Sequence, residues 1–120
     1  MLQKIYWKLL YARKVDLVDV SKPDWRLAVT GRYRFGTTVT VRVGDVHVPG
    51  IYVEVTRNGR TTPLPKGSGI ALKVVADVAK ALATPKGRLL LLKLSPHDRE
   101  HLVTTLSETT AISSWLNTFA

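Results

Sequence analysis

The stretch that decides the fold runs from residue 32 to residue 43 and reads RYRFGTTVTVRV. Its odd-numbered positions are Tyr33, Phe35, Thr37, Val39, Val41 and Val43, and its even-numbered positions are Arg32, Arg34, Gly36, Thr38, Thr40 and Arg42. Because successive side chains of a β-strand point to opposite faces, this alternation predicts one long strand with an apolar face and a basic face. Gly36 is the position where we expect the strand to bend or bulge.

The next strand is predicted at residues 51–57, where Ile51, Val53 and Val55 alternate with polar residues and Tyr52. The sequence RNGR follows at residues 57–60, and Asn-Gly between two strand-like runs predicts a two-residue type I′ hairpin. Pro63 and Pro65 restrict the return strand to a short one at an edge of the sheet. Residues 15–20 form a further short strand that ends at the turn-forming sequence SKPD.

The rest of the chain favours helices. Residues 70–82 place apolar side chains on one helical face, with Lys73 and Asp77 paired four residues apart on the other. Unbroken leucines predict a buried strand over residues 88–94. Ser95-Pro96 starts a helix that runs to about residue 106, and residues 112–119 have the apolar spacing of a last one. Residues 2–11 have helical spacing too.

These elements define an α+β fold. We expect a curved antiparallel sheet of four to five strands, with two to three helices packed on one face and a basic opposite face. Residues 1–120 form one domain, because the chain is long enough for one hydrophobic core and too short for two. The C-terminal segment 95–120, which ends in an apolar stripe, is the expected site of oligomerisation, and we expect a homodimer.

The charge balance indicates the class of partner. Eighteen Lys and Arg residues against nine acids give a net charge of +9 and a pI near 10.2. Most of this charge precedes residue 94, and such an excess is typical of proteins that bind a polyanion, above all nucleic acid. The chain has no cysteine and no apolar run long enough to cross a membrane. We therefore expect a cytoplasmic protein without a membrane partner, and the scarcity of Cys and Met suggests a thermophilic source.

The candidate nucleic-acid-binding residues lie mainly on the basic sheet face. Arginines and threonines in a row suit a phosphate backbone, because both donate hydrogen bonds and arginine adds charge. Tyr52 shares its face with Glu54 and Thr56, so it is the best candidate for stacking on a base, whereas Tyr33 and Phe35 are expected in the core. The complete set is Trp25, Arg32, Arg34, Thr38, Thr40, Arg42, Tyr52, Arg57, Arg60 and Lys66.

Two other motifs are better explained without catalysis. The sequence KGSG at residues 66–69 opens a helix and could hold a phosphate, but it is not a Walker A loop, and a plain turn explains it. The sequence HDREH at residues 97–101 has zinc-ligand spacing, but it falls in the first turn of a helix, where acidic residues favour the helix dipole. We therefore expect no enzyme, no metal and no cofactor.

Residues 38–82 resemble the DNA-binding domain of the positive-cofactor-four transcriptional coactivators. The similar segments are VTVR at residues 39–42, YVEV at 52–55, NGR at 58–60 and PKGSGIAL at 65–72. The insertion of Ser68-Gly69 and the elements after the helix depart from that family. Residues 19–26, DVSKPDWR, together with the Asn-Gly turn, are similar to the ThermoDBP group of single-strand-binding proteins from thermophilic archaea.

Both resemblances imply binding of single-stranded DNA, largely independent of sequence, by basic and aromatic side chains, and the first also implies a dimer. Arg42, Tyr52, Arg57, Arg60 and Lys66 would then be contacts. Two alternatives remain open. The first is an RNA-binding protein of translation or of a ribonucleoprotein, which the same charge and aromatic residues would serve. The second is a protein–protein adaptor that works through residues 2–10 and 112–119.

Overall fold

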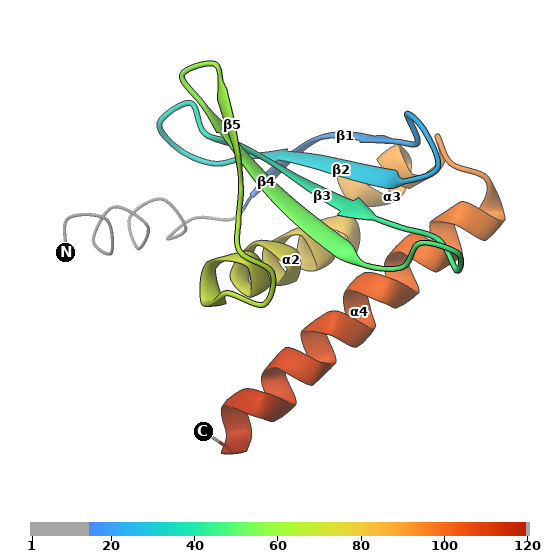
Figure 1. Cartoon of the computed structure of the whole chain (residues 1–120). Coiled ribbons are helices and arrows are strands. Elements are labelled where there is room, and N and C mark those ends of the chain that lie inside the picture. The colour runs from blue at the N-terminus through green and yellow to red at the C-terminus, as the bar shows by residue number, and fades with distance from the viewer. Residues whose placement is uncertain (1–14, 120) are drawn as a thin grey trace, which may run out of the picture.

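The structure is a computed structural model that describes residues 15–119. Five strands form one open antiparallel sheet in the order β1-β2-β3-β4-β5, and three helices, α2, α3 and α4, complete the described part (Figure 1). The strands are β1 (Asp16–Ser21), β2 (Leu27–Arg32), β3 (Thr38–Val43), β4 (Ile51–Arg57) and β5 (Arg60–Pro63). The α+β class is therefore confirmed. The helix expected at residues 2–11 lies outside the described residues.

The prediction of one long strand over residues 32–43 is wrong, because the chain reverses in the middle of it. Phe35 and Gly36 have φ values of 61° and 68°, and the Tyr33 amide donates to the Thr37 carbonyl at 2.9 Å. Two consecutive residues in the left-handed region turn the chain through a tight loop, so β2 and β3 become neighbours in the sheet. The alternation of residue types in the sequence continues through the loop, and for this reason it concealed the turn.

Strand β4 and its hairpin follow the sequence prediction. β4 has the expected bounds, and Asn58 and Gly59 have φ values of 52° and 76°, as a type I′ turn requires. Arg57 and Arg60 face each other across this turn, and β5 ends at Pro63 on the edge of the sheet. The position of β5 at the edge agrees with the absence of an amide hydrogen in proline.

Helix α2 (Gly69–Leu82) is also as expected, with Lys73 Nζ 2.8 Å from the Asp77 carboxylate. The buried strand predicted at residues 88–94 is wrong. Helix α3 (Pro85–Leu91) occupies most of this segment, capped by Thr84 and with Pro85 in the first turn. Leu89 and Leu92 are 68% and 61% exposed, so the run of leucines is not uniformly buried and its pattern is helical.

Helix α4 (Pro96–Phe119) is continuous, whereas the sequence predicted two separate helices over this segment. Its start agrees with the prediction, since the hydroxyl of Ser95 accepts from the Asp98 amide at 3.2 Å. No helix in the described part of the chain is long and apolar enough to cross a membrane.

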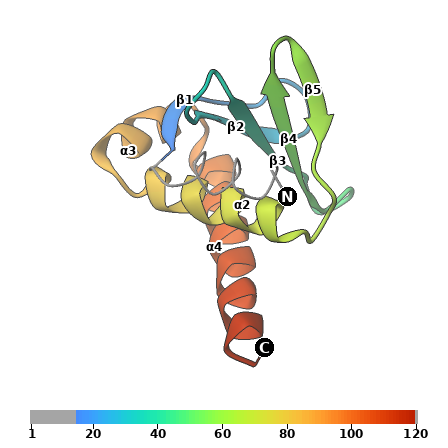
Figure 2. The same cartoon turned by 90° about the vertical axis from the view of Figure 1, so that its left-hand side faces the viewer.

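The helices pack on one side of the sheet, and the core lies between the two layers (Figures 1 and 2). The strands contribute mainly valines, such as Val29, Val39 and Val41, to which α2 and α4 add Val74, Val78, Leu102 and Leu106. Tyr33 is buried, as expected, and its hydroxyl donates to Asp77 at 2.7 Å. Phe35 is 58% exposed, so its expected place in the core is wrong. No described helix covers the other side of the sheet, which we call the open face.

Candidate nucleic-acid interface

The open face of the sheet carries the polar residues that the alternation assigned to it. On β3, Val39, Val41 and Val43 are buried, whereas Thr38, Thr40 and Arg42 are only half-buried. The register brings residues of β4 beside them, because Thr38 pairs with Thr56, Thr40 with Glu54 and Arg42 with Tyr52. Glu54 adds an acid to this face, and Arg42 Nε lies 3.7 Å from its carboxylate. The middle of the open face therefore carries both positive and negative charge, and the excess of positive charge does not lie there.

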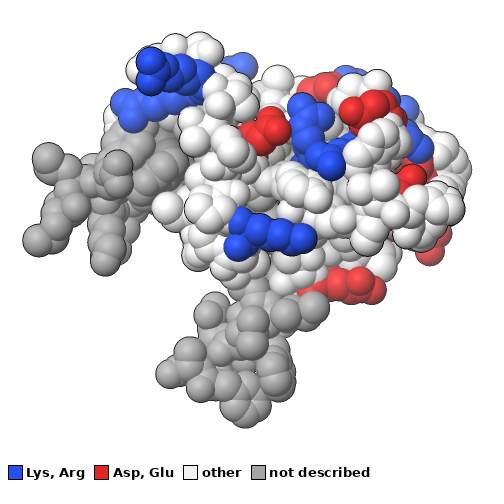
Figure 3. Space-filling view, viewed as in Figure 1, with Lys and Arg blue, Asp and Glu red and all other residues white. Residues whose placement is uncertain are grey.

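Four arginines lie at one end of the sheet, which we call the arginine end: Arg32, Arg34, Arg57 and Arg60. Because Arg32 pairs with Thr38 and Thr38 pairs with Thr56, the β2–β3 and β4–β5 turns come to the same end of the sheet. The two turns lie side by side in Figures 1 and 2, and Figure 3 shows Lys and Arg side chains gathered there, at the upper left. Arg57 and Arg60 are directly opposed, an unfavourable arrangement that a polyanion would relieve.

Most of the ion pairs between described residues involve a lysine. Of the five ion pairs between described residues, four involve a lysine: Lys22–Asp98, Lys73–Asp77, Lys86–Asp16 and Lys93–Asp19. The hydrogen bond from Lys86, at 2.7 Å, lowers the pKa of Asp16, and the one from Lys93, at 2.8 Å, lowers the pKa of Asp19. Acids thus compensate lysines of α3, of the segment that follows it and of α2.

A second group, which we call the aromatic cluster, lies at the opposite end of β3 and β4 and comprises Trp25, Arg26, Tyr52 and Lys66. The guanidinium carbon of Arg26 is 4.1 Å from the centre of the Trp25 ring and 4.3 Å from that of Tyr52. Lys66 Nζ is 5.8 Å from the centre of the Tyr52 ring. Trp25 and Tyr52 are 40% and 38% exposed, so both rings remain accessible to a ligand.

Two glycines make room for these rings. A Cβ atom at Gly44 would lie 3.2 Å from the Trp25 ring and only 2.0 Å from the Val48 carbonyl oxygen. A Cβ atom at Gly50, where φ is +136°, would lie 3.2 Å from the Tyr52 ring. The amide of Gly44 donates to the carbonyl of Gly50 at 2.9 Å and closes the loop between β3 and β4. This loop therefore seats both aromatic rings.

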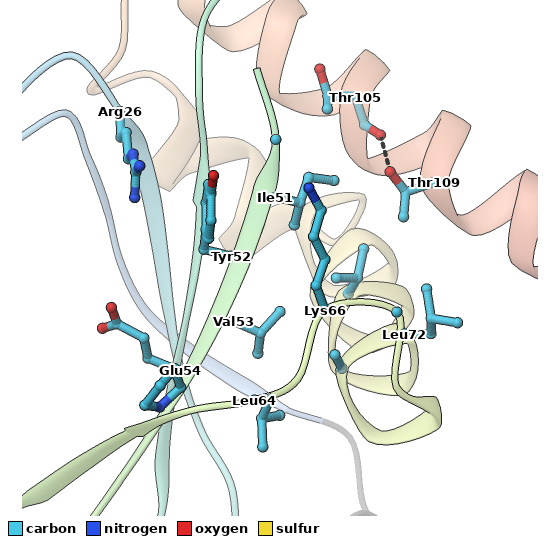
Figure 4. Close-up of a pocket in the computed structure, with 15 residues that line it drawn as sticks. Arg26, Ile51, Tyr52, Val53, Glu54, Leu64, Lys66, Leu72, Thr105 and Thr109 are labelled. Carbon is cyan, nitrogen blue, oxygen red and sulfur yellow. Dashed lines mark hydrogen bonds between the residues drawn. The ribbon is translucent and has the colours of Figure 1, made fainter. Parts of the chain in front are cut away.

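A groove of about 480 Å³ opens beside Tyr52 and runs between β4, the segment after β5, and helices α2 and α4 (Figure 4). Its walls are mostly apolar and include Ile51, Val53, Leu64, Leu72 and Val75. Arg26, Lys66 and Glu54 provide its charged groups, with Tyr52 between Arg26 and Lys66 in Figure 4. An apolar groove with a few charged groups at its border is typical of a ligand-binding site.

The structure thus divides the ten predicted residues between two places. Arg32, Arg34, Arg57 and Arg60 form the arginine end, and Trp25, Tyr52 and Lys66 belong to the aromatic cluster. Thr38, Thr40 and Arg42 lie on β3 between them. Arg26 was not predicted, since nothing in the sequence indicates that it contacts Tyr52, which lies two strands away in the sheet.

The two motifs that the sequence analysis set aside have structural roles here. Ser68 of the KGSG sequence caps α2 by accepting from the Ala71 amide at 3.2 Å. In the HDREH sequence, Asp98 pairs with Lys22, and His101 Nε2 lies 2.7 Å from the carbonyl oxygen of Gly44. Among the described residues, no group of three or more His, Cys, Asp or Glu side chains could hold a metal ion.

No protein-family model matches this chain, and neither does any curated protein or solved structure. The resemblance to the two groups of single-strand-binding proteins therefore rests on the short sequences quoted above and stays a prediction.

Proposed function

We propose that the protein binds single-stranded nucleic acid, single-stranded DNA in the first place, along the open face of its sheet. The observation that carries this proposal is the arrangement of cations and aromatic rings along the sheet. Arg32 lies in register with the open-face residues, Arg57 and Arg60 lie at the tip of the neighbouring hairpin, and two exposed aromatic residues with a cation between them stand at the other end of the sheet. Cationic grooves combined with stacking platforms are the means by which proteins hold single strands without reading their sequence.

The aromatic rings favour a single strand over a duplex. Each ring has a large apolar surface that an unpaired base can cover, whereas the bases of a duplex are already stacked on one another. From Tyr52 to Arg57 the strand β4 covers about 17 Å, at about 3.3 Å per residue, so one strand of several nucleotides can contact both places. Thr38 and Thr40 would donate hydrogen bonds to the phosphates between them.

Binding should be measured by fluorescence anisotropy with labelled single-stranded DNA, duplex DNA and RNA of one sequence. We expect single-stranded DNA to bind most tightly, and Tyr52→Ala to weaken its binding by about tenfold, since stacking of one base on an aromatic ring contributes about 1–3 kcal/mol. Leu92→Ala is the matched control, because Leu92 is an exposed apolar residue next to α3, away from the open face. Binding to none of the three nucleic acids at low salt would refute the proposal, and tighter binding to RNA would favour the RNA-binding alternative.

We also infer that the protein acts as a homodimer. The C-terminal half of α4 extends beyond α2 and beyond the sheet in both views (Figures 1 and 2), which leaves this part of the helix available to a second copy. A homodimer would double the cationic surface that one strand can contact. Sedimentation velocity of the full chain over a range of concentrations tests this inference, and a monomer at every concentration would refute it.

A further inference from the structure

Arg26 differs from the other arginines of the open face in its surroundings. Its guanidinium lies close to two aromatic rings, at 4.1 Å and 4.3 Å, and these contacts fix its position and restrict its orientation. Its Nε atom is buried without a hydrogen-bond partner, and no ion pair with a described carboxylate involves Arg26. Because Nε is buried, a ligand would meet the two terminal nitrogens of the guanidinium, which the rings hold in place and which make no hydrogen bond to a described residue.

The groove beside Arg26 suits a base better than a phosphate. Its walls are largely apolar, as the two faces of a base are, and a charged phosphate would lose its hydration there. Glu54 also lines the groove, and its carboxylate, which lies 3.7 Å from Arg42 Nε, repels phosphate but accepts hydrogen bonds from a base. Lys66 stands on the other side of Tyr52, where the phosphate attached to such a base could pair with it (Figure 4).

We propose that this groove binds one unpaired guanine of the nucleic acid, with Arg26 as the residue that specifies it. Arg26 donates to O6 and N7 of the base, the pair of acceptors that an arginine fork matches best. Glu54 can accept from the amino group and N1–H on the neighbouring edge of the same base. Adenine presents an amino group in place of O6 and would bring two donors together. The inference rests on the proposed function and adds to it a preference for one base at one position.

The test uses single-stranded oligomers of thymidine that carry one central guanine, adenine or 7-deazaguanine, which lacks the N7 acceptor. We expect the unaltered protein to bind the guanine oligomer about tenfold more tightly than the adenine oligomer, with most of this advantage lost on 7-deazaguanine. Arg26→Lys keeps the positive charge and removes the pair of guanidinium donors that would face O6 and N7. It should bind the guanine and adenine oligomers with equal affinity.

The outcomes separate this inference from the proposed function. Equal, tight binding of the guanine, adenine and 7-deazaguanine oligomers by the unaltered protein would overturn the guanine inference and leave single-strand binding in place. Absence of binding to every oligomer would refute both. Free dGMP, tested as a competitor against free dAMP, shows whether the groove takes the nucleotide without the strand. Displacement of the guanine oligomer by dGMP alone supports the inference, and equal competition by both nucleotides overturns it.

Discussion

The salt dependence of binding tests most directly whether the open face is the site. Six cations belong to the proposed path of the strand: Arg32, Arg34, Arg42, Arg57, Arg60 and Lys66. If each neutralises one phosphate, the slope of log affinity against log salt is about −4.2, at about −0.7 per contact for single strands. Between 50 and 200 mM salt the affinity should then fall by roughly 300-fold.

Removing the two arginines at the tip of the β4–β5 hairpin gives a defined change in this slope. The double variant Arg57→Ala/Arg60→Ala loses two of the six contacts, so its slope should be about −2.8, and its affinity should fall by roughly 50-fold over the same range of salt. The matched control is Lys80→Ala/Arg88→Ala, which removes two exposed cations from α2 and α3. Anisotropy titrations at four salt concentrations give both slopes.

The control variant Lys80→Ala/Arg88→Ala distinguishes an effect of the position of the cations from an effect of net charge. If binding depends on where the cations lie, the α2/α3 variant keeps the slope of the unaltered protein. Equal slopes for the two double variants would show that only the net charge matters, and that the open face of the sheet is not the binding site.

Three further predictions concern stability and can be measured by urea unfolding. Gly50→Ala should destabilise the protein by about 1–3 kcal/mol, because φ is +136° there and the new Cβ would press on the Tyr52 ring. Ser68→Ala should cost about 1 kcal/mol by removing the cap of α2, whereas Ser107→Ala, at an exposed position within α4, should change little. Since the folded-state pKa values of Asp16 and Asp19 lie below the ordinary aspartate value of 3.8, the stability they contribute is complete above that pH and is lost as the pH falls through the lowered values. Lys86→Ala/Lys93→Ala should therefore flatten the decline in stability between about pH 5 and pH 2.

The parts of the fold that could be predicted are those whose signals are local. The Asn-Gly turn requires two residues with positive φ, and the alternation on β4 belongs to one strand alone, so both followed from a few neighbouring residues. The chain reversal at Phe35 could not be predicted in this way, because a bulky residue is uncommon in the left-handed region. β2 also escaped prediction, since Leu27, Ala28 and Val29 are all buried and show no alternation.

In the segment of helix α3 two local sequence signals disagree: the helix start at Thr84-Pro85 and the run of leucines that follows it. Thr84-Pro85 has the same cap and proline as Ser95-Pro96, and both pairs start helices. The run of leucines that follows Pro85 predicts a buried strand, but two of its members, Leu89 and Leu92, face solvent. In this segment the start signal was more informative than the hydrophobicity of the residues after it.

The sequence indicates most of the charged residues of the candidate site, but it does not indicate the contact between Arg26 and Tyr52. Arg42 and Tyr52 could be assigned to one face because alternation along β3 and β4 places them there, whereas Arg57 has the parity of the buried Val53 and Val55. The stack of Arg26 on Tyr52 depends on the order of the strands and on a loop that closes between Gly44 and Gly50, and neither is visible in a local pattern. A contact between residues on different strands is set by the tertiary fold, and a single sequence carries little information about it.

The positions of the lysines and of the arginines would link the stability of this fold to the proposed function. Lys86 and Lys93 are held by acids of β1, so the charge near α3 costs the folded state little. In contrast, Arg57 and Arg60 are cross-strand neighbours at a two-residue turn. Repulsion between their like charges opposes folding of the hairpin. A polyanion bound at the arginine end, as we propose, would reduce that repulsion and so would gain part of its binding free energy from the hairpin. It follows that ligand binding should stabilise the β4–β5 hairpin more than the helices.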